Sequence, residues 1–234
     1  IKWTLVVILF LILLASLFFF QIKKQQSEYH KNELQVWASM KEGITYIYRT
    51  KEILGALCLD MFAVLFGGAV AMIPVFASDI LKVGADGFGL LNAASDIGSM
   101  MIIVTLSFIP LRKNQGKILI GVVAGFGLCI IGFGLSKLYW LSFLFLMLSG
   151  IFDGISVVIR GTIVQLKTPD HIRGRVMSAN SIFIMSSNEM GQFESGVAAK
   201  LLGVVRSVVF GGTMTVLIAL FVGKFVPKLR KMEY

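Results

Sequence analysis

The stretch ILIGVVAGFGLCIIGFGLS at residues 118–136 decides the fold class. It contains no charged residue, and it is close to the ~20 apolar residues that an α-helix needs to cross the hydrocarbon core of a bilayer. Two further uncharged runs, at 3–22 and 207–223, have the same character. Only helices and closed barrels satisfy their backbone groups in lipid, and unbroken apolar runs do not fit the alternating pattern of a barrel strand. The sequence therefore predicts an all-α membrane protein.

The composition of the whole chain supports this class. Of 234 residues, 56% are hydrophobic and 15% are charged, whereas soluble domains carry about 25% charged residues. Such a composition excludes a soluble enzyme, a disordered tail and a nucleic-acid-binding domain. Cys58 and Cys129 are single residues in apolar runs, without the spacing of metal ligands, and we interpret them as inert small hydrophobes.

Hydrophobicity predicts seven transmembrane helices. They cover approximately residues 3–22, 53–78, 87–111, 118–136, 138–166, 176–199 and 207–223. The predicted organisation is one transmembrane helix in 1–22, a cytoplasmic linker in 23–52 and a six-helix unit in 53–234.

The basic residues give the direction of the helices. Sixteen of the 22 lysines and arginines lie in the loops after odd-numbered helices and in the C-terminal tail, five lie on the opposite side, and Arg160 lies inside a helix. The positive-inside rule then predicts a cytoplasmic C-terminus and an external N-terminus. Because the chain begins with Ile1, we expect a fragment whose missing part crosses the membrane an odd number of times. The net charge of +9 follows from topology and needs no nucleic-acid partner.

The linker at 23–52 has two interpretations, which the sequence leaves open. Apolar residues recur in it at helical spacing among lysines and glutamates, at Leu34, Trp37, Met40, Ile44 and Ile47. This pattern favours an amphipathic helix on the cytoplasmic face of the membrane. The alternative is a partly ordered linker.

Six ionisable residues interrupt the later helices: Asp60, Asp96, Asp153, Arg160, Glu189 and Glu194. Each costs about 2.5–3.5 kcal/mol at a helix centre, so six facing lipid would cost on the order of 15–20 kcal/mol. We therefore expect most of them to face one another or a wet cavity. Glu194 is close enough to the outer surface to be solvated.

Distance along the chain predicts which of these residues meet. Asp153 and Glu189 each lie 18 residues from the turn at His171, which predicts two acids near the midplane. Asp60 and Arg160 lie at similar depths toward the cytoplasm, which predicts an ion pair. For that pair, a role in packing alone and a role in transport are equally open. For Glu189 a functional role is favoured, because an unpartnered acid in a medium of low dielectric constant holds a proton near neutral pH.

Small residues predict close helix packing. Gly121 and Gly125, and again Gly150 and Gly154, have the GxxxG spacing that lets helix backbones approach. Pro74 predicts a kink in the second helix. There is no HExxH, GxSxG or GxxxxGK[ST] motif, so neither an enzyme, nor ATP hydrolysis, nor a cofactor or metal site is predicted.

Several strings resemble a known family. They are DMFAVLFGGAV at 60–70, PVFA at 74–77, VGA at 83–85, VVIR at 157–160, TPD at 168–170, RGRV at 173–176, NE at 188–189 and QFESG at 192–196. Together they resemble the major facilitator superfamily, in its bacterial branch of enterobactin-exporter-like and macrolide-efflux-like permeases. The resemblance implies two six-helix halves that work by alternating access. The chain would supply helix six, the inter-half linker and the C-terminal half, and the missing N-terminal half would supply the other five helices.

The resemblance also implies roles for particular residues. Arg173, Gly174 and Arg175 match the basic cytoplasmic turn that locks and releases the gate of the family. The loop at 112–117 is similar to a degraded copy of the other basic loop, without its acidic residue. Asp96 stands where this branch has a small or apolar residue, which makes it a candidate for substrate preference.

The leading functional hypothesis is a proton-coupled antiporter in the bacterial inner membrane. It would export a small amphiphilic molecule such as a drug, toxin or siderophore, with Asp153 and Glu189 carrying protons. The excess of membrane acids over the single Arg160 favours a cationic or neutral substrate. The alternative is a non-transporting membrane scaffold or sensor subunit, and a membrane-embedded enzyme ranks last.

Overall fold

The computed structural model describes residues 2–19, 33–111, 113–230 and 232. Contacts divide the chain into two compact units, residues 1–36 and residues 37–234. In the first unit, helix α1 (Lys2–Phe19) covers most of the predicted span at 3–22. Its 18 residues correspond to a length of about 27 Å, and its apolar side chains from Val6 to Phe18 are mostly exposed.

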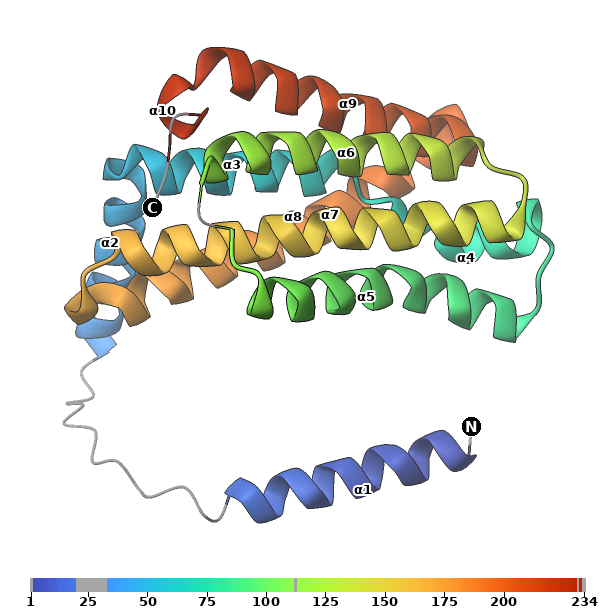
Figure 1. Ribbon diagram of the computed structural model, residues 1–234, viewed down its shortest axis with the longest axis horizontal. Helices are drawn as coiled ribbons and strands as arrows, with labels where there is room; N and C mark the ends of the chain where they lie inside the picture. The colour runs from blue at the N-terminus through green and yellow to red at the C-terminus, as the bar shows by residue number, and fades with distance from the viewer. Residues whose placement is uncertain (1, 20–32, 112, 231, 233–234) are drawn as a thin grey trace. The chain divides into compact units, whose positions relative to one another are not determined.

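The second unit is a bundle of long helices with short connections (Figure 1). Its elements are α2 (Glu33–Arg49), which begins just before the unit does, α3 (Lys51–Phe66), η1 (Ala69–Met72), α4 (Ile73–Val75), η2 (Phe76–Ile80), α5 (Ala85–Phe108), α6 (Gln115–Leu135), α7 (Tyr139–Lys167), η3 (Asp170–Ile172), α8 (Arg173–Leu202), α9 (Val204–Phe225) and α10 (Pro227–Arg230). The described residues form helices and no strand, so the predicted all-α membrane fold is confirmed.

Five stretches of the described chain are long and apolar enough to cross a bilayer. They are Lys51–Ile80, Ala85–Phe108, Gln115–Leu135, Tyr139–Lys167 and Val204–Phe225. Each coincides with a predicted transmembrane helix to within a few residues. Helix α8 coincides with the predicted span at 176–199, but it carries Asn188, Glu189, Gln192 and Glu194 in its second half. Because of these polar residues, α8 is less apolar than the five stretches named above.

The helices pair in a pattern that relates two groups of three. The principal pairings are α6 with α9, α5 with α7, α6 with α7, α3 with α8 and α3 with α9. If α3 is exchanged with α7, α5 with α8, and α6 with α9, the same set of pairings results. Helices α3 and α7 run in opposite directions (Figure 1). The bundle therefore has the arrangement expected of two inverted three-helix repeats.

The helix that begins with α3 breaks earlier than predicted. We expected a kink at Pro74, but α3 ends at Phe66 and the backbone loosens at Gly67 and Gly68. A 3₁₀ turn, the short α4 and a π-helical turn then follow in succession. Pro74 lies at the beginning of α4, where a missing N–H costs little. The two glycines, rather than the proline, therefore mark the break.

Candidate functional site

A polar cavity of about 410 Å³ lies among α3, α5, α6, α7 and α8. Its polar lining consists of Asn92, Ser95, Asp96 and Ser99 from α5, Ser149 and Asp153 from α7, and Asn188 and Gln192 from α8. The remaining wall is apolar and includes Phe126 and Leu146. Among the residues that the structure describes, two carboxylates and no basic side chain line the cavity. Hydrogen-bonding groups and a net negative charge on a partly apolar wall suit an amphiphilic molecule that carries amines or hydroxyls.

A close crossing of α5 and α7 builds one wall of this cavity. A Cβ added at Gly150 would lie 1.9 Å from the Ser95 carbonyl oxygen, and one added at Gly98 would lie 2.0 Å from the Met147 carbonyl oxygen. Only glycine fits at either position. The Ser99 hydroxyl donates a hydrogen bond of 2.8 Å to the Gly150 carbonyl oxygen. The crossing thus sets Ser95 and Ser99 beside the α7 residues that line the cavity, as the GxxxG spacing at Gly150 and Gly154 predicts.

The break after α3 forms another part of the wall. Gly67, Gly68 and Val70 line the cavity, and a Cβ added at Gly68 would lie 2.8 Å from the Gly191 carbonyl oxygen on α8. Irregular backbone is tolerated at membrane depth where it lines a cavity or is covered by protein. The broken segment therefore places backbone groups close to the cavity, where an unbroken helix would hide them.

An ion-pair network lies next to the cavity. Arg160 forms an ion pair with Asp60, and both side chains are more than nine-tenths buried. The second guanidinium nitrogen of Arg160 lies 3.9 Å from the Asp153 carboxylate, whose side chain is 44% exposed. The Arg160 Nε atom also donates to the Ser156 hydroxyl at 3.2 Å.

The network therefore shares one positive charge between a buried acid and an acid at the cavity wall. The ion pair of Asp60 with Arg160 is the one that depth along the chain predicts. Because Arg160 lies closer to the Asp60 carboxylate than to the Asp153 carboxylate, it neutralises the charge of Asp153 only in part. Asp153 is the acid of this network that a proton or a cation in the cavity can reach.

The other predicted site residues do not all lie at the polar cavity. Asp96 lines the cavity, and its role in substrate preference stays a prediction. Glu189 is exposed, lines neither this cavity nor the apolar one described below, and lies on the face of α8 opposite the buried Gly191 and Ser195. The structure therefore does not bring Glu189 to the cavity that Asp153 lines, and its role in carrying protons stays a prediction.

The predicted gating turn lies where α8 begins. Arg173 pairs with Asp170, Arg175 pairs with Glu42 of α2, and a Cβ at Gly174 would meet nothing within 4 Å. Helix α2 lies against this turn: the Tyr46 hydroxyl donates to the Lys167 carbonyl oxygen at the end of α7. Within the linker at 23–52, residues 33–49 form a helix, as the amphipathic interpretation expects, and this helix contacts the turn that the resemblance associates with gating. Its position on the membrane face stays a prediction.

The close contact of α2 with the turn depends on Gly43. A Cβ there would lie 2.6 Å from the Arg175 carbonyl oxygen, so we expect Gly43→Ala to push α2 away from α8. In limited proteolysis of the membrane-embedded protein, trypsin should then cleave after Lys41 and Arg49 at least about fivefold faster, because overpacking costs 1–3 kcal/mol.

The matched control is Glu42→Gln, which removes only an ion pair with both side chains more than 40% exposed. Such pairs contribute about 0–1 kcal/mol, so cleavage should change little. Equal cleavage of the two variants would contradict the close packing of α2 on the turn.

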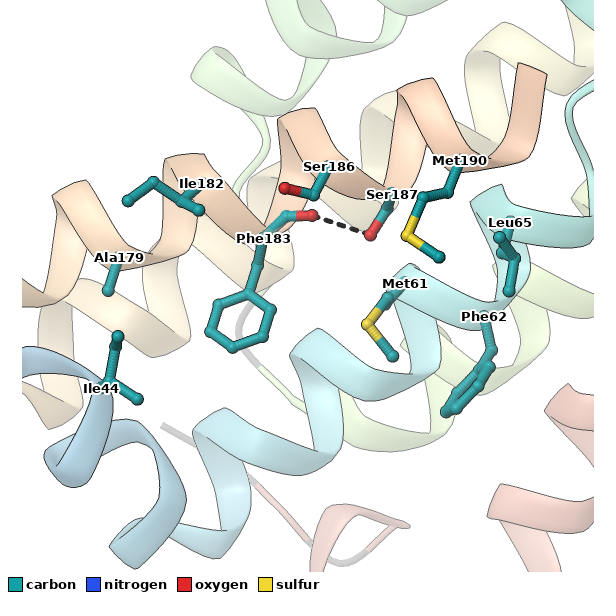
Figure 2. Close-up of a pocket in the computed structure, with 10 residues that line it drawn as sticks. All are labelled: Ile44, Met61, Phe62, Leu65, Ala179, Ile182, Phe183, Ser186, Ser187 and Met190. Carbon is teal, nitrogen blue, oxygen red and sulfur yellow. Dashed lines mark hydrogen bonds between the residues drawn. The ribbon is translucent and has the colours of Figure 1, made fainter. Parts of the chain in front are cut away.

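A second cavity, of about 420 Å³, is almost wholly apolar. Figure 2 shows Met61, Phe62 and Leu65 of α3 facing Phe183 and Met190 of α8, with Ile44 of α2 at one end. The Ser187 hydroxyl donates to the Phe183 carbonyl oxygen within the helix, so it offers no donor to the cavity. This cavity was not predicted from the sequence, because methionine and phenylalanine in an apolar helix do not distinguish a cavity from a lipid-facing surface.

The sequence does contain a signal for the polar cavity, in the spacing of polar residues on two helices. Asn92, Ser95 and Ser99 recur at helical spacing on α5, as Asn188 and Gln192 do on α8. Polar residues on one stripe of an apolar helix favour a surface that is not exposed to lipid. In the described part of the chain, no three histidine, cysteine, aspartate or glutamate side chains are grouped as metal ligands would be.

Comparison with known proteins identifies a family. A family model described as transmembrane secretion effector covers residues 1–234, the whole sequence. No curated protein and no solved structure matches the chain.

Proposed function

Because the chain belongs to the transmembrane secretion effector family of the major facilitator superfamily, it is a membrane transport protein, and we propose that it is part of a proton-coupled exporter of small amphiphilic molecules. The observation that carries this proposal is the polar cavity, whose lining, in the described part of the chain, includes two acids and no base. Membership of this family implies a transporter and not an enzyme.

The proposed mechanism is an exchange at Asp153. The carboxylate faces the cavity, and the nearest guanidinium nitrogen of Arg160 lies 3.9 Å away. Because Arg160 neutralises it only in part, it binds either a proton or a cationic group of the substrate. Substrate entering from the cytoplasm displaces the proton, and a proton entering from outside displaces the substrate. Alternating access separates the two events, since the six-helix unit moves as one body against the N-terminal half.

The remaining assignments complete this proposal. Asp96, on the α5 wall, selects for positive charge in the substrate. Glu189, on the exposed face of α8, carries a proton at the surface toward the N-terminal half, and Arg173, Gly174 and Arg175 gate the cytoplasmic side. The proposed location is the bacterial inner membrane with the C-terminus in the cytoplasm, in agreement with the distribution of lysine and arginine. The division into 1–22, 23–52 and 53–234 stays a prediction.

Asp153→Asn tests the exchange. In proteoliposomes of the full-length transporter, with tetraphenylphosphonium as an organic-cation probe, we expect wild-type efflux to follow an imposed pH gradient. Asp153→Asn should abolish this dependence, because an amide does not take up a proton. Glu189→Gln should reduce it, because the proposal assigns Glu189 a role in carrying protons.

The matched control for Asp153→Asn is Asp79→Asn, which changes an exposed acid that does not line the cavity. It should leave the pH dependence unchanged. Wild-type flux that ignores the pH gradient would refute antiport. A full-length protein that moves no amphiphile in either direction would favour the scaffold or sensor alternative.

A further inference from the structure

Helix α2 has an outer face that the bundle does not cover. Gly43 and Ile47 are buried on its inner face. Trp37, Lys41 and Tyr48 follow one another at helical spacing and are exposed, and the exposed Arg49 flanks them. Trp37 is 74% exposed and Tyr48 is 59% exposed. Large aromatic and basic side chains together on one exposed helix face are typical of surfaces that lie at a membrane–water interface.

The position of α2 along the bundle places it at the depth of lipid headgroups. Helix α7 contains 29 residues and is therefore about 43 Å long, close to the 40–45 Å of a bilayer with its headgroups. At its beginning, Trp140 is 73% exposed next to Tyr139, as in an aromatic belt. At its end, the Lys167 carbonyl accepts the hydrogen bond from Tyr46. Helix α2 crosses the bundle at this end (Figure 1), which puts it in the opposite headgroup layer.

The charge of the outer face selects among headgroups. Glu42 pairs with Arg175, so it does not neutralise Lys41 or Arg49, and both of these are exposed. Neighbouring Lys51 and Lys167 at the same end of the bundle are also exposed. A basic surface at headgroup depth attracts anionic lipids, and the attraction increases with each lysine or arginine.

We propose that the outer face of α2, formed by Trp37, Lys41, Tyr48 and Arg49, is a docking surface for anionic phospholipid headgroups. The aromatic rings insert among the headgroups, and the two cations pair with phosphate groups. Because α2 also contacts the turn at Arg175, the helix binds lipid headgroups on its exposed side and packs against the turn on its buried side. This inference does not depend on the substrate, the coupling ion or the direction of transport.

The first arm of the test measures depth. The full-length protein is placed in nanodiscs, and the Trp37 signal is the part of the tryptophan emission that Trp37→Phe removes. We expect phosphatidylcholine brominated close to its carbonyl groups to quench this signal, and iodide in the water to leave most of it. Quenching by iodide alone would place Trp37 in the aqueous phase, and quenching by neither would place it against protein; either result overturns the proposal.

The second arm measures the selectivity for charge. The Trp37 signal is compared in nanodiscs of phosphatidylcholine alone and of phosphatidylcholine mixed in equal parts with phosphatidylglycerol. We expect phosphatidylglycerol to shift the emission to shorter wavelength, and the combined variant Lys41→Gln, Arg49→Gln to lose most of this shift, because both cations that attract the anionic headgroups are removed. Lys137→Gln, an exposed lysine at the other end, is the matched control. A shift that ignores phosphatidylglycerol, or that all variants share, overturns the assignment to anionic lipid.

Discussion

Replacing Arg160 with glutamine is expected to lower the free energy of unfolding of the bundle by about 3–5 kcal/mol, because it leaves the buried carboxylate of Asp60 without its partner. The loss should appear as reduced thermal stability in detergent and as a lower yield of folded protein. Arg206→Gln is the matched control, since Arg206 is exposed at the far end of the bundle and should change stability by less than about 0.5 kcal/mol.

The double variant Asp60→Asn, Arg160→Gln identifies the cause of this loss. With both charges removed, no isolated charge stays buried, and a buried pair contributes little net stability over a neutral replacement. The double variant should therefore be more stable than Arg160→Gln alone. If the two single losses simply add, the ion pair does not form in the folded protein.

Replacing Gly150 with alanine is expected to destabilise the protein by about 1–3 kcal/mol, although alanine is the better helix former. The added Cβ would overlap the Ser95 carbonyl oxygen at 1.9 Å, so α5 and α7 must separate and the hydrogen bond from Ser99 is lost. Because this crossing builds a wall of the polar cavity, transport should decrease with stability. Thermal unfolding in detergent and probe efflux in proteoliposomes measure the two effects.

Gly161→Ala is the control, on the same helix. A Cβ at Gly161 meets nothing within 4 Å, so the substitution should stabilise the protein by about 0.5–1 kcal/mol through helix propensity alone. The two variants make the same chemical change with opposite expected signs. A stabilising effect of Gly150→Ala would show that α5 and α7 do not approach as closely as the structure places them.

The sequence predicted the helices well because lipid leaves the backbone few alternatives. An uncharged run such as 118–136 has one stable form in a bilayer, and its ends are set by the first charges beyond it. The pairing of Asp60 with Arg160 was also predictable, since both lie at similar depth and each is costly alone. Close packing at Gly150 followed from the GxxxG spacing.

The lining of the polar cavity and the position of the break after α3 were not predicted. The cavity depends on five helices meeting, and helix periodicity alone does not state which stripes converge. The break was assigned to Pro74 because proline removes a donor, whereas Gly67 and Gly68 loosen the helix where α8 and the cavity replace the missing contacts. The position of Glu189 was predicted from depth only, and depth does not give the direction in which a side chain points around its helix.

One guanidinium between two carboxylates has an electrical consequence. Asp60, Arg160 and Asp153 together bear a single unit of negative charge when no proton is bound. A proton cancels that unit, and so does a monovalent organic cation, so swapping one for the other would move no net current through Asp153. Turnover limited by this swap would then respond to acidity on the two sides and be indifferent to voltage across the membrane.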